Sequence, residues 1–214
     1  MKRVFVNGYG SIGSRISNFI NDDPEIQLIG VGKYSPDNKT NDALNSGLSV
    51  FVPNSRLANF NNFKISGSIE DALKDCDLVI DATPGGQGYK NKKFLYEPNN
   101  IKVIYQGGES ITGENPVSNL IFNSRVNYET AFDATHIMQG SCNVTGMGRI
   151  LEPLRTKFGS SIKRFDVTLV RRWADIDQID ENVTDTIELT QSPHHGDDVK
   201  SYFGKDSPLF VRAI

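Results

Sequence analysis

KRVFVNGYGSIG, residues 2–13, is the stretch that decides the fold of this 214-residue chain. Its apolar first half predicts a buried strand, and apolar residues at helical spacing over 12–20 predict a helix. Between them, Gly8, Gly10 and Gly13 complete a G-x-G-x-x-G motif. In this context the glycines permit a tight turn, backbone approach to a pyrophosphate and close helix packing. We predict a dinucleotide-binding turn; the alternative is a glycine-rich turn without a ligand.

Short apolar runs alternate with amphipathic stretches through the first 140 residues. Further strands are expected at Ile26–Val31, Leu78–Asp81 and Lys102–Tyr105. Ser68 followed by Asp71 resembles the capping box that begins a helix. This alternation predicts parallel strands with helices on their faces. We therefore predict an α/β fold, with a Rossmann-type dinucleotide-binding domain over residues 1–140 and an α+β catalytic domain over residues 141–214.

The segment after the second strand usually selects the cofactor, because an acid there binds the ribose hydroxyls of NAD. Here the strand runs into Lys33, and no acid follows until Asp37. Lys33 is a candidate partner for the 2′-phosphate of NADP, or else a solvated surface lysine. We favour NADP, with NAD as the alternative. Glycine-rich turns at 81–86 and 106–109 follow later strands, where ligands of open α/β sheets bind, although ordinary turns would look alike.

The composition narrows the class of protein. Hydrophobic residues make up 37% of the chain and charged residues 23%, which fits a globular protein. A net charge of −3 without a basic stripe argues against a nucleic-acid partner. We see no apolar run that could span a bilayer and no signal segment, so we predict a cytoplasmic protein without a membrane partner. The two cysteines are too few for a disulfide framework, and we expect no metal site.

Cys142 stands immediately before a predicted helix over 143–158, in which Pro153 should introduce a kink or shift the boundary. Because a helix N-terminus stabilises negative charge, we expect Cys142 to have thiolate character. A thiolate can attack an aldehyde; hydride transfer to a nicotinamide leaves a thioester, from which phosphate releases an acyl phosphate. The alternative is a small buried residue at a domain junction. Cys76, flanked by acids that should raise its pKa, is interpreted as structural.

Two segments of the second half carry candidate anion ligands. Arg171 and Arg172 end a strand predicted over 163–171, and His194–Gly196 lies in a predicted loop. Arginine binds phosphate in a bidentate manner and glycine admits backbone amides, so we predict a substrate-phosphate site. A surface ion pair and a solvated turn are the alternatives. Adjacent residues of a strand face opposite sides, so one arginine faces the site. His136 is interpreted as structural.

Six motifs, in this order, resemble those of the archaeal-type phosphorylating glyceraldehyde-3-phosphate dehydrogenases. They are NGYGSIG at 7–13, DATPGG at 81–86, QGGE at 106–109, SCNVTG at 141–146, RRWAD at 171–175 and SPHHG at 192–196. The resemblance covers nearly the whole chain. It implies a homotetramer that uses NADP and often NAD, with glyceraldehyde 3-phosphate and inorganic phosphate as substrates.

The resemblance also implies roles for individual residues. Those contacting the dinucleotide would be Ser11, Ile12, Gly108 and Arg172. Those surrounding the substrate would be Ser141, Asn143, His195 and Gly196. Cys142 would be the nucleophile.

Two departures from the family pattern stand out. Val144 occupies a position where the family commonly has threonine, a mild change on a helix. The family's catalytic base is a histidine in a segment that would follow Ile214, and residues 209–214 read as a strand that has just begun. We therefore expect a truncated catalytic domain that holds the nucleophile but not its general base.

Two other functions remain open. A semialdehyde or acyl-phosphate reductase would share the dinucleotide turn and the cysteine nucleophile. The motifs at 106–109 and 192–196 nevertheless favour a glyceraldehyde-3-phosphate dehydrogenase. A truncated, non-catalytic dinucleotide-binding module would bind cofactor without turnover.

Overall fold

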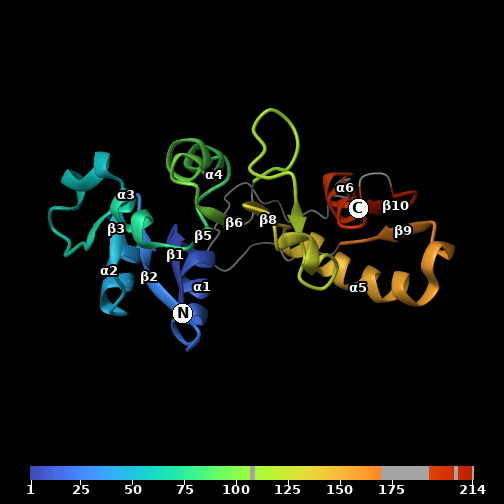
Figure 1. Ribbon diagram of the computed structural model, residues 1–214, viewed down its shortest axis with the longest axis horizontal. Helices are drawn as coiled ribbons and strands as arrows, with labels where there is room; N and C mark the ends of the chain where they lie inside the picture. Colours follow the sequence, from blue (N-terminus) through green and yellow to red (C-terminus); the bar gives the residue numbers. More distant parts are fainter. Residues whose placement is uncertain (107–108, 170–192, 205–206, 214) are drawn as a thin grey trace, which may run out of the picture. The chain divides into compact units, whose positions relative to one another are not determined.

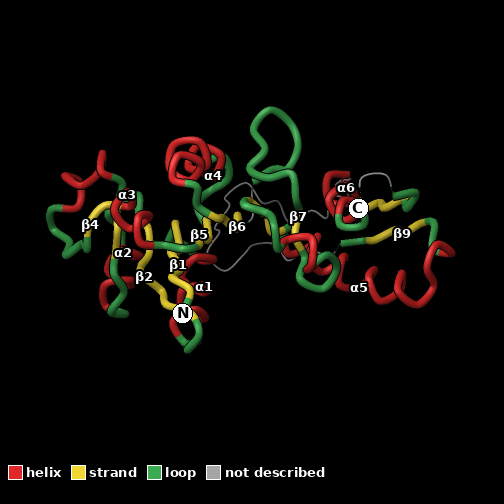
Figure 2. Tube along the Cα trace, viewed as in Figure 1, coloured by secondary structure: helices red, strands yellow, loops and turns green. Residues whose placement is uncertain are grey.

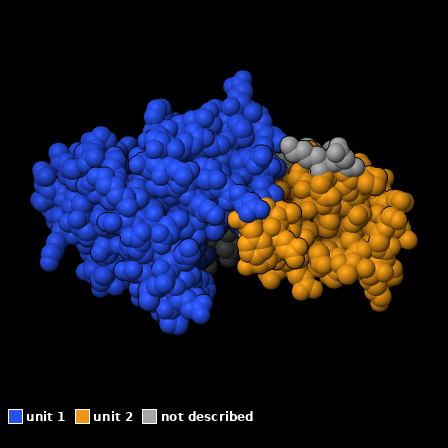
Figure 3. Space-filling view, in the orientation of Figure 1, with its two compact units in different colours: residues 1–120, 133–139 blue, residues 121–132, 140–214 orange. Residues whose placement is uncertain are grey.

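The computed structural model describes residues 1–106, 109–169, 193–204 and 207–213. These residues form two compact units, coloured blue and orange in Figure 3. The first unit comprises residues 1–120 and 133–139, and the second comprises residues 121–132 and 140–214. The chain therefore passes between the units at residues 120–121, 132–133 and 139–140.

A parallel sheet forms the centre of the first unit (Figures 1 and 2). Its strands are β1 (Lys2–Asn7), β2 (Ile26–Gly32), β3 (Val50–Val52), β4 (Gly67–Ser68), β5 (Leu78–Asp81), β6 (Lys102–Tyr105) and β8 (His136–Gln139). They are hydrogen-bonded in the order β4-β3-β2-β1-β5-β6-β8, and every neighbouring pair is parallel. The predicted Rossmann-type sheet is confirmed.

Short helices connect these strands. They are α1 (Ser11–Asn21), α2 (Asn38–Asn45), η1 (Asn54–Phe60), α3 (Ile69–Ala72), η2 (Leu73–Asp75), α4 (Gln87–Asn91), η3 (Lys92–Tyr96) and η4 (Glu97–Asn99). The Ser68 hydroxyl accepts a hydrogen bond from the Asp71 amide at 3.0 Å, which confirms the predicted helix start. The Asp37 carboxylate caps α2 through the Thr40 amide at 3.1 Å. This cap explains how a polar segment without a long apolar face forms a helix.

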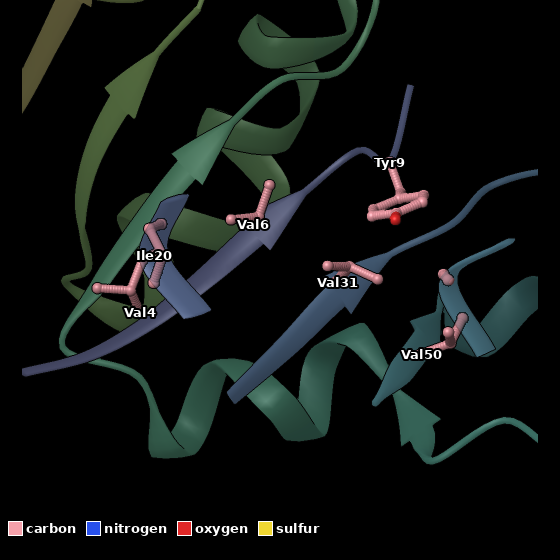
Figure 4. Packing of buried hydrophobic residues seen from close by; sticks show 7 residues of the cluster. Val4, Val6, Tyr9, Ile20, Val31 and Val50 are labelled. Carbon is pink, nitrogen blue, oxygen red and sulfur yellow. The ribbon is translucent and has the colours of Figure 1, made fainter. Parts of the chain in front are cut away.

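The core of the first unit lies around β1 (Figure 4). Val4 and Val6 of β1 pack with Ile20 of α1 and Val31 of β2, and all four are buried. On β1 the intervening Phe5 is fully buried as well, with its ring edge-on to Phe51. A strand buried on both faces must be apolar at successive positions, which is why residues 4–6 read as an unbroken apolar run.

The second unit contains both helices and strands. Its elements are β7 (Ile121–Phe122), η5 (Tyr128–Ala131), α5 (Cys142–Phe158), η6 (Gly159–Ser161), β9 (Arg164–Val167), α6 (Pro193–Ser201) and β10 (Phe210–Ala213). Strands β9 and β10 pair in parallel. The loop expected at His194–Gly196 is wrong, because these residues lie in α6. Proline is favourable in the first turn of a helix, so Pro193 begins α6 rather than a turn.

Helix α5 confirms the helix predicted after the thiol and runs without interruption through Pro153. Val144, Met147 and Leu151 form its buried face. Ser141 caps it, since the hydroxyl accepts a hydrogen bond from the Val144 amide at 3.3 Å. No helix in the described part of the chain has the length and apolar character needed to cross a membrane.

We expect Gly13→Ala to destabilise the first unit by about 1–3 kcal/mol or more, because the new methyl group would overlap the Gly8 carbonyl oxygen. Gly10→Ala is the matched control, since a methyl group there meets no atom within 4 Å. Urea unfolding, with hydrogen exchange of the β1 amides as the probe, measures both variants. Equal loss of protection in the two variants would contradict this account.

Candidate functional site

The turn between β1 and α1 depends on glycine at two positions. Gly8 has a φ of 105°, a left-handed conformation, and a side chain there would lie 2.8 Å from the backbone of Ala82. A side chain on Gly13 would overlap the carbonyl oxygen of Gly8. The helix can therefore approach β1 and β5 only because both residues lack a side chain.

The N-terminus of α1 is open to a ligand. Gly10, at the N-cap position, has no side chain that could cap the helix, and the space beside its Cα is empty to 4 Å. Ser11 and Ile12 begin the helix, and Ile12 is 49% exposed although it is apolar. Backbone N–H groups at an uncapped helix N-terminus are donors suited to a phosphate group. The arrangement fits the pyrophosphate of a dinucleotide.

Lys33, which follows β2, is buried and ion-paired. Its Nζ donates to both carboxylate oxygens of Asp37, at 2.8 and 2.9 Å, and the lysine side chain is 8% exposed. Partial burial raises the pKa of Asp37, but the hydrogen bond from Lys33 and its charge outweigh this effect, so the pKa lies below its usual value. Lys33 is therefore not the solvated surface lysine considered from the sequence.

A buried polar cluster underlies the carboxyl ends of β1 and β5. The Tyr96 hydroxyl donates to the Asp81 carboxylate at 2.6 Å and accepts from Asn7 Nδ2 at 2.6 Å. Asn91 Nδ2 also donates to Asp81, at 2.9 Å. Burial, followed by the charge of Asp81, raises the pKa of Tyr96 well above its ordinary value. These bonds hold the end of β1, the end of β5 and the helical segment 87–96 together.

Tyr96 and Asn91 were not predicted from the sequence, and Asn7 was noted only as the first residue of the motif at 7–13. A signal was present at Asn7, a polar residue that directly follows three buried apolar positions. Tyr96 and Asn91 offered none, because their partners lie far away along the chain. Asp81 was noted only as part of a turn, and it also accepts from the Thr83 amide at 2.9 Å.

The thiol of Cys142 is exposed at the first residue of α5. Its Sγ lies 4.0 Å from Asn143 Oδ1, the acceptor of a weak hydrogen bond. Ser141 precedes it as the N-cap. The thiol is thus accessible to a small electrophile and lies at the positive end of a 17-residue helix. The other cysteine, Cys76, is partly buried.

Tyr202, just after α6, supports the first turns of α5. A side chain on Gly148 would lie 2.8 Å from the Tyr202 ring, and one on Gly140 would lie 2.5 Å from its hydroxyl oxygen. Asn123 Nδ2 donates to the Thr145 carbonyl oxygen at 3.2 Å. Because Gly140 and Gly148 lack side chains, Tyr202 packs closely against the chain both before and after Cys142 in the sequence.

The remaining predicted site residues differ in how they are placed. His195 is buried, with 9% exposure, in α6. Gly196 lies against β10, where a side chain would come within 2.5 Å of the Val211 carbonyl oxygen. Its lack of a side chain thus has a packing reason that the sequence did not reveal. Gly108, Arg171 and Arg172 lie outside the described residues. In the described part of the chain, no group of three or more acidic, cysteine or histidine side chains is arranged to hold a metal ion.

Curated proteins of known name are similar to the chain over most of its length. The chain is 37% identical over 209 residues to the glyceraldehyde-3-phosphate dehydrogenase of Halobacterium salinarum, with 95% of this chain and 60% of that protein covered. The enzyme of the same name from Methanothermus fervidus is 37% identical over 208 residues, covering 94% and 59%. The chain is a homologue of archaeal glyceraldehyde-3-phosphate dehydrogenases. The resemblance predicted from the six motifs is confirmed.

The chain spans about 60% of the length of these relatives. No family profile matches it. Among solved structures, aspartate semialdehyde dehydrogenase with NADP from Candida albicans is similar, with a TM-score of 0.69 at 17% identity. The alignment covers 100% of this chain and 66% of that one. At this identity the similarity establishes the fold alone, in agreement with the predicted α/β class.

Iodoacetamide is expected to alkylate Cys142 and to leave Cys76 unmodified near neutral pH. Burial, followed by the charge of Asp77, raises the pKa of Cys76 to about 11, whereas Cys142 is exposed. The thiolate is the reactive form, so labelling of Cys76 should increase about tenfold per pH unit until its pKa is reached. Peptide mass spectrometry after a short reaction distinguishes the two sites, and preferential labelling of Cys76 would refute the assignment.

Proposed function

We propose that the chain carries the cofactor turn and the nucleophile of an NAD(P)-dependent phosphorylating glyceraldehyde-3-phosphate dehydrogenase. The product would be 1,3-bisphosphoglycerate. The observation that carries the proposal is an exposed thiol at the start of α5 in a homologue of enzymes with this name. The proposed enzyme is cytoplasmic and, in its full-length form, homotetrameric.

Cys142 performs the covalent chemistry in this proposal. Its Sγ attacks the aldehyde carbon of the substrate, forming a C–S bond and a thiohemiacetal. A bound nicotinamide dinucleotide supplies the acceptor for the hydride that leaves this carbon. Inorganic phosphate then attacks the resulting thioester, the C–S bond breaks, and Sγ leaves as a thiolate while the acyl phosphate departs. The positive end of α5 stabilises the thiolate at the beginning and at the end of the cycle.

Neighbouring residues position the substrate. Ser141 and Asn143 flank the thiol on the chain, and Asn143 Oδ1 lies 4.0 Å from Sγ. The Nδ2 group of the same amide is the proposed donor to a substrate oxygen. His195 and Gly196 of α6 are proposed to contact the substrate as well. As the hydride leaves, a general base must accept the hydroxyl proton of the thiohemiacetal, and the resemblance implies a histidine in a segment of the longer relatives for this role.

The dinucleotide is proposed to bind at the open N-terminus of α1. Gly10 leaves open space beside its Cα, and Gly8 and Gly13 let the turn pack closely on the ends of β1 and β5, so we propose that all three shape this site. The further proposed contacts are Ser11, Ile12, Lys33, Gly108 and Arg172. Because Lys33 already pairs with Asp37, its charge is shared, and we propose that either NADP or NAD is accepted.

The decisive experiment measures reduced nicotinamide formed by the purified chain from glyceraldehyde 3-phosphate, with NADP or NAD. Turnover by this chain would require another group in the role of the general base. Such turnover should depend on inorganic phosphate and fall by at least about 10³-fold in Cys142→Ser, because that variant lacks the nucleophile. Cys76→Ser should retain the activity. Turnover that persists in Cys142→Ser would refute the proposed mechanism.

A substrate panel separates the other functions. Faster oxidation of aspartate semialdehyde than of glyceraldehyde 3-phosphate would indicate the reductase alternative. Cofactor binding without any turnover would assign the reaction to a longer form of the protein and leave this chain as a dinucleotide-binding module.

Asp37→Asn should raise the preference for NADP over NAD. The substitution keeps a good helix cap but removes the carboxylate that holds Lys33, so the ammonium becomes available to a 2′-phosphate. We expect the ratio of NADPH to NADH affinity, measured by cofactor fluorescence, to rise about tenfold, the value of one charge-assisted hydrogen bond. Asp42→Asn, on the same helix, is the control. An unchanged ratio would show that Lys33 does not reach the ribose phosphate.

A further inference from the structure

The first unit contains a pocket of about 360 Å³ beside the start of β8. Lys92, Glu97, Pro116, Ser118 and His136 are among the residues that line it. His136 is the first residue of β8, whereas the glycine-rich turn follows the last residue of β1. In a parallel sheet the amino ends and the carboxyl ends of the strands lie on opposite sides, so the pocket is separate from the proposed dinucleotide site.

His136 lines this pocket, and Tyr105 holds its ring in place. Its ring stacks on Tyr105, with centroids 5.8 Å apart and planes at 17°, and its Nδ1 lies 2.8 Å from the Tyr105 hydroxyl. Burial, and then the charge of Lys92, lowers the pKa of His136, which favours the neutral ring. A hydroxyl that donates to Nδ1 leaves the ring hydrogen on Nε2. Tyr105 therefore orients the ring, and we adopt the tautomer in which the Tyr105 hydroxyl donates to Nδ1 and Nε2 carries the N–H.

Lys92 brings a positive charge to the same pocket. Its side chain is 16% exposed, and its Nζ donates to the Pro116 carbonyl oxygen at 3.1 Å. Glu97 lies 3.9 Å from Lys92 but only 3.1 Å from Lys93, to which it is hydrogen-bonded. An ammonium has three N–H donors, and the Pro116 carbonyl accepts one of them. Burial lowers the pKa of Lys92, so the charged form gains from an anionic partner.

We propose that this pocket binds a small oxyanion, a phosphate or carboxylate group, between Lys92 and His136. An oxyanion would accept from the ammonium and from the imidazole N–H, two donors held by Pro116 and Tyr105 on the protein side. Glu97 is hydrogen-bonded to Lys93, which does not line the pocket, so its charge is shared and Lys92 can bind an added anion. The proposal does not depend on the reaction assigned to Cys142.

Proton NMR of the histidine rings tests the proposal, because the chain has only three histidines. His136→Gln identifies the His136 signal. At constant pH and ionic strength, inorganic phosphate, and in a second titration acetate, should shift this signal until it saturates. Lys92→Met should weaken binding about tenfold, the loss expected for one charge-assisted hydrogen bond. Glu97→Gln should tighten it, because a repelling carboxylate is removed.

Lys90→Met is the matched control, since Lys90 is exposed on the same helical segment. It should leave the binding curve unchanged. A His136 shift that grows linearly with anion concentration, or that is the same in Lys92→Met, would mean an adventitious ion only and would overturn the proposal. A saturable shift confined to the other two histidines would place the anion elsewhere and would overturn it too. Saturation by phosphate but not by acetate would restrict the ligand to the phosphate class.

Discussion

Helix α1 packs tightly against the end of β1, and the geometry at the carboxyl ends of β1 and β5 depends on this contact. Gly13 packs so closely on the Gly8 carbonyl that no side chain fits. Gly8 in turn lies against the backbone of Ala82, which follows β5. One steric constraint thus fixes the position of a helix N-terminus relative to two strands. An anion-binding geometry follows from backbone packing alone, without any charged side chain.

Buried polar groups reinforce this edge at a thermodynamic cost. Asn7, Asp81 and Tyr96 are at most 2% exposed, and each would be unfavourable in an apolar core without partners. Two hydrogen bonds of 2.6 Å join them, while Asn7 Oδ1 is buried without a hydrogen-bond partner among the described residues. Such a cluster penalises any other register of β1 against β5, since a shift would leave these groups unpaired. Specificity of the edge, rather than additional stability, is what the polar residues contribute.

Structural features that depend on a local sequence pattern could be predicted from the sequence. The apolar run of β1, the helical spacing of α1 and α5, and the Ser68 cap were all recognised because their signals lie within a few residues. Features that depend on distant partners were not predictable. Lys33 looked like a phosphate ligand or a surface residue, and its pairing with Asp37 required the turn that brings them together. Gly196 looked like part of an anion-binding loop, yet it lies in α6 and its neighbour is Val211 of β10. Segments such as α2 and β3 are too short or too polar to show a periodicity.

The path of the chain between the two units has a consequence for how the protein folds as it is made. Residues 121–132 belong to the second unit, whereas β8 (136–139) returns to pair with β6 of the first. Until residue 139 has left the ribosome, β6 presents an unpaired edge, and unpaired edges promote association with other chains. Synthesis therefore exposes a vulnerable intermediate for the time needed to translate the intervening segment. A chaperone that shields strand edges would act at this stage, before the thiol-bearing helix has been completed.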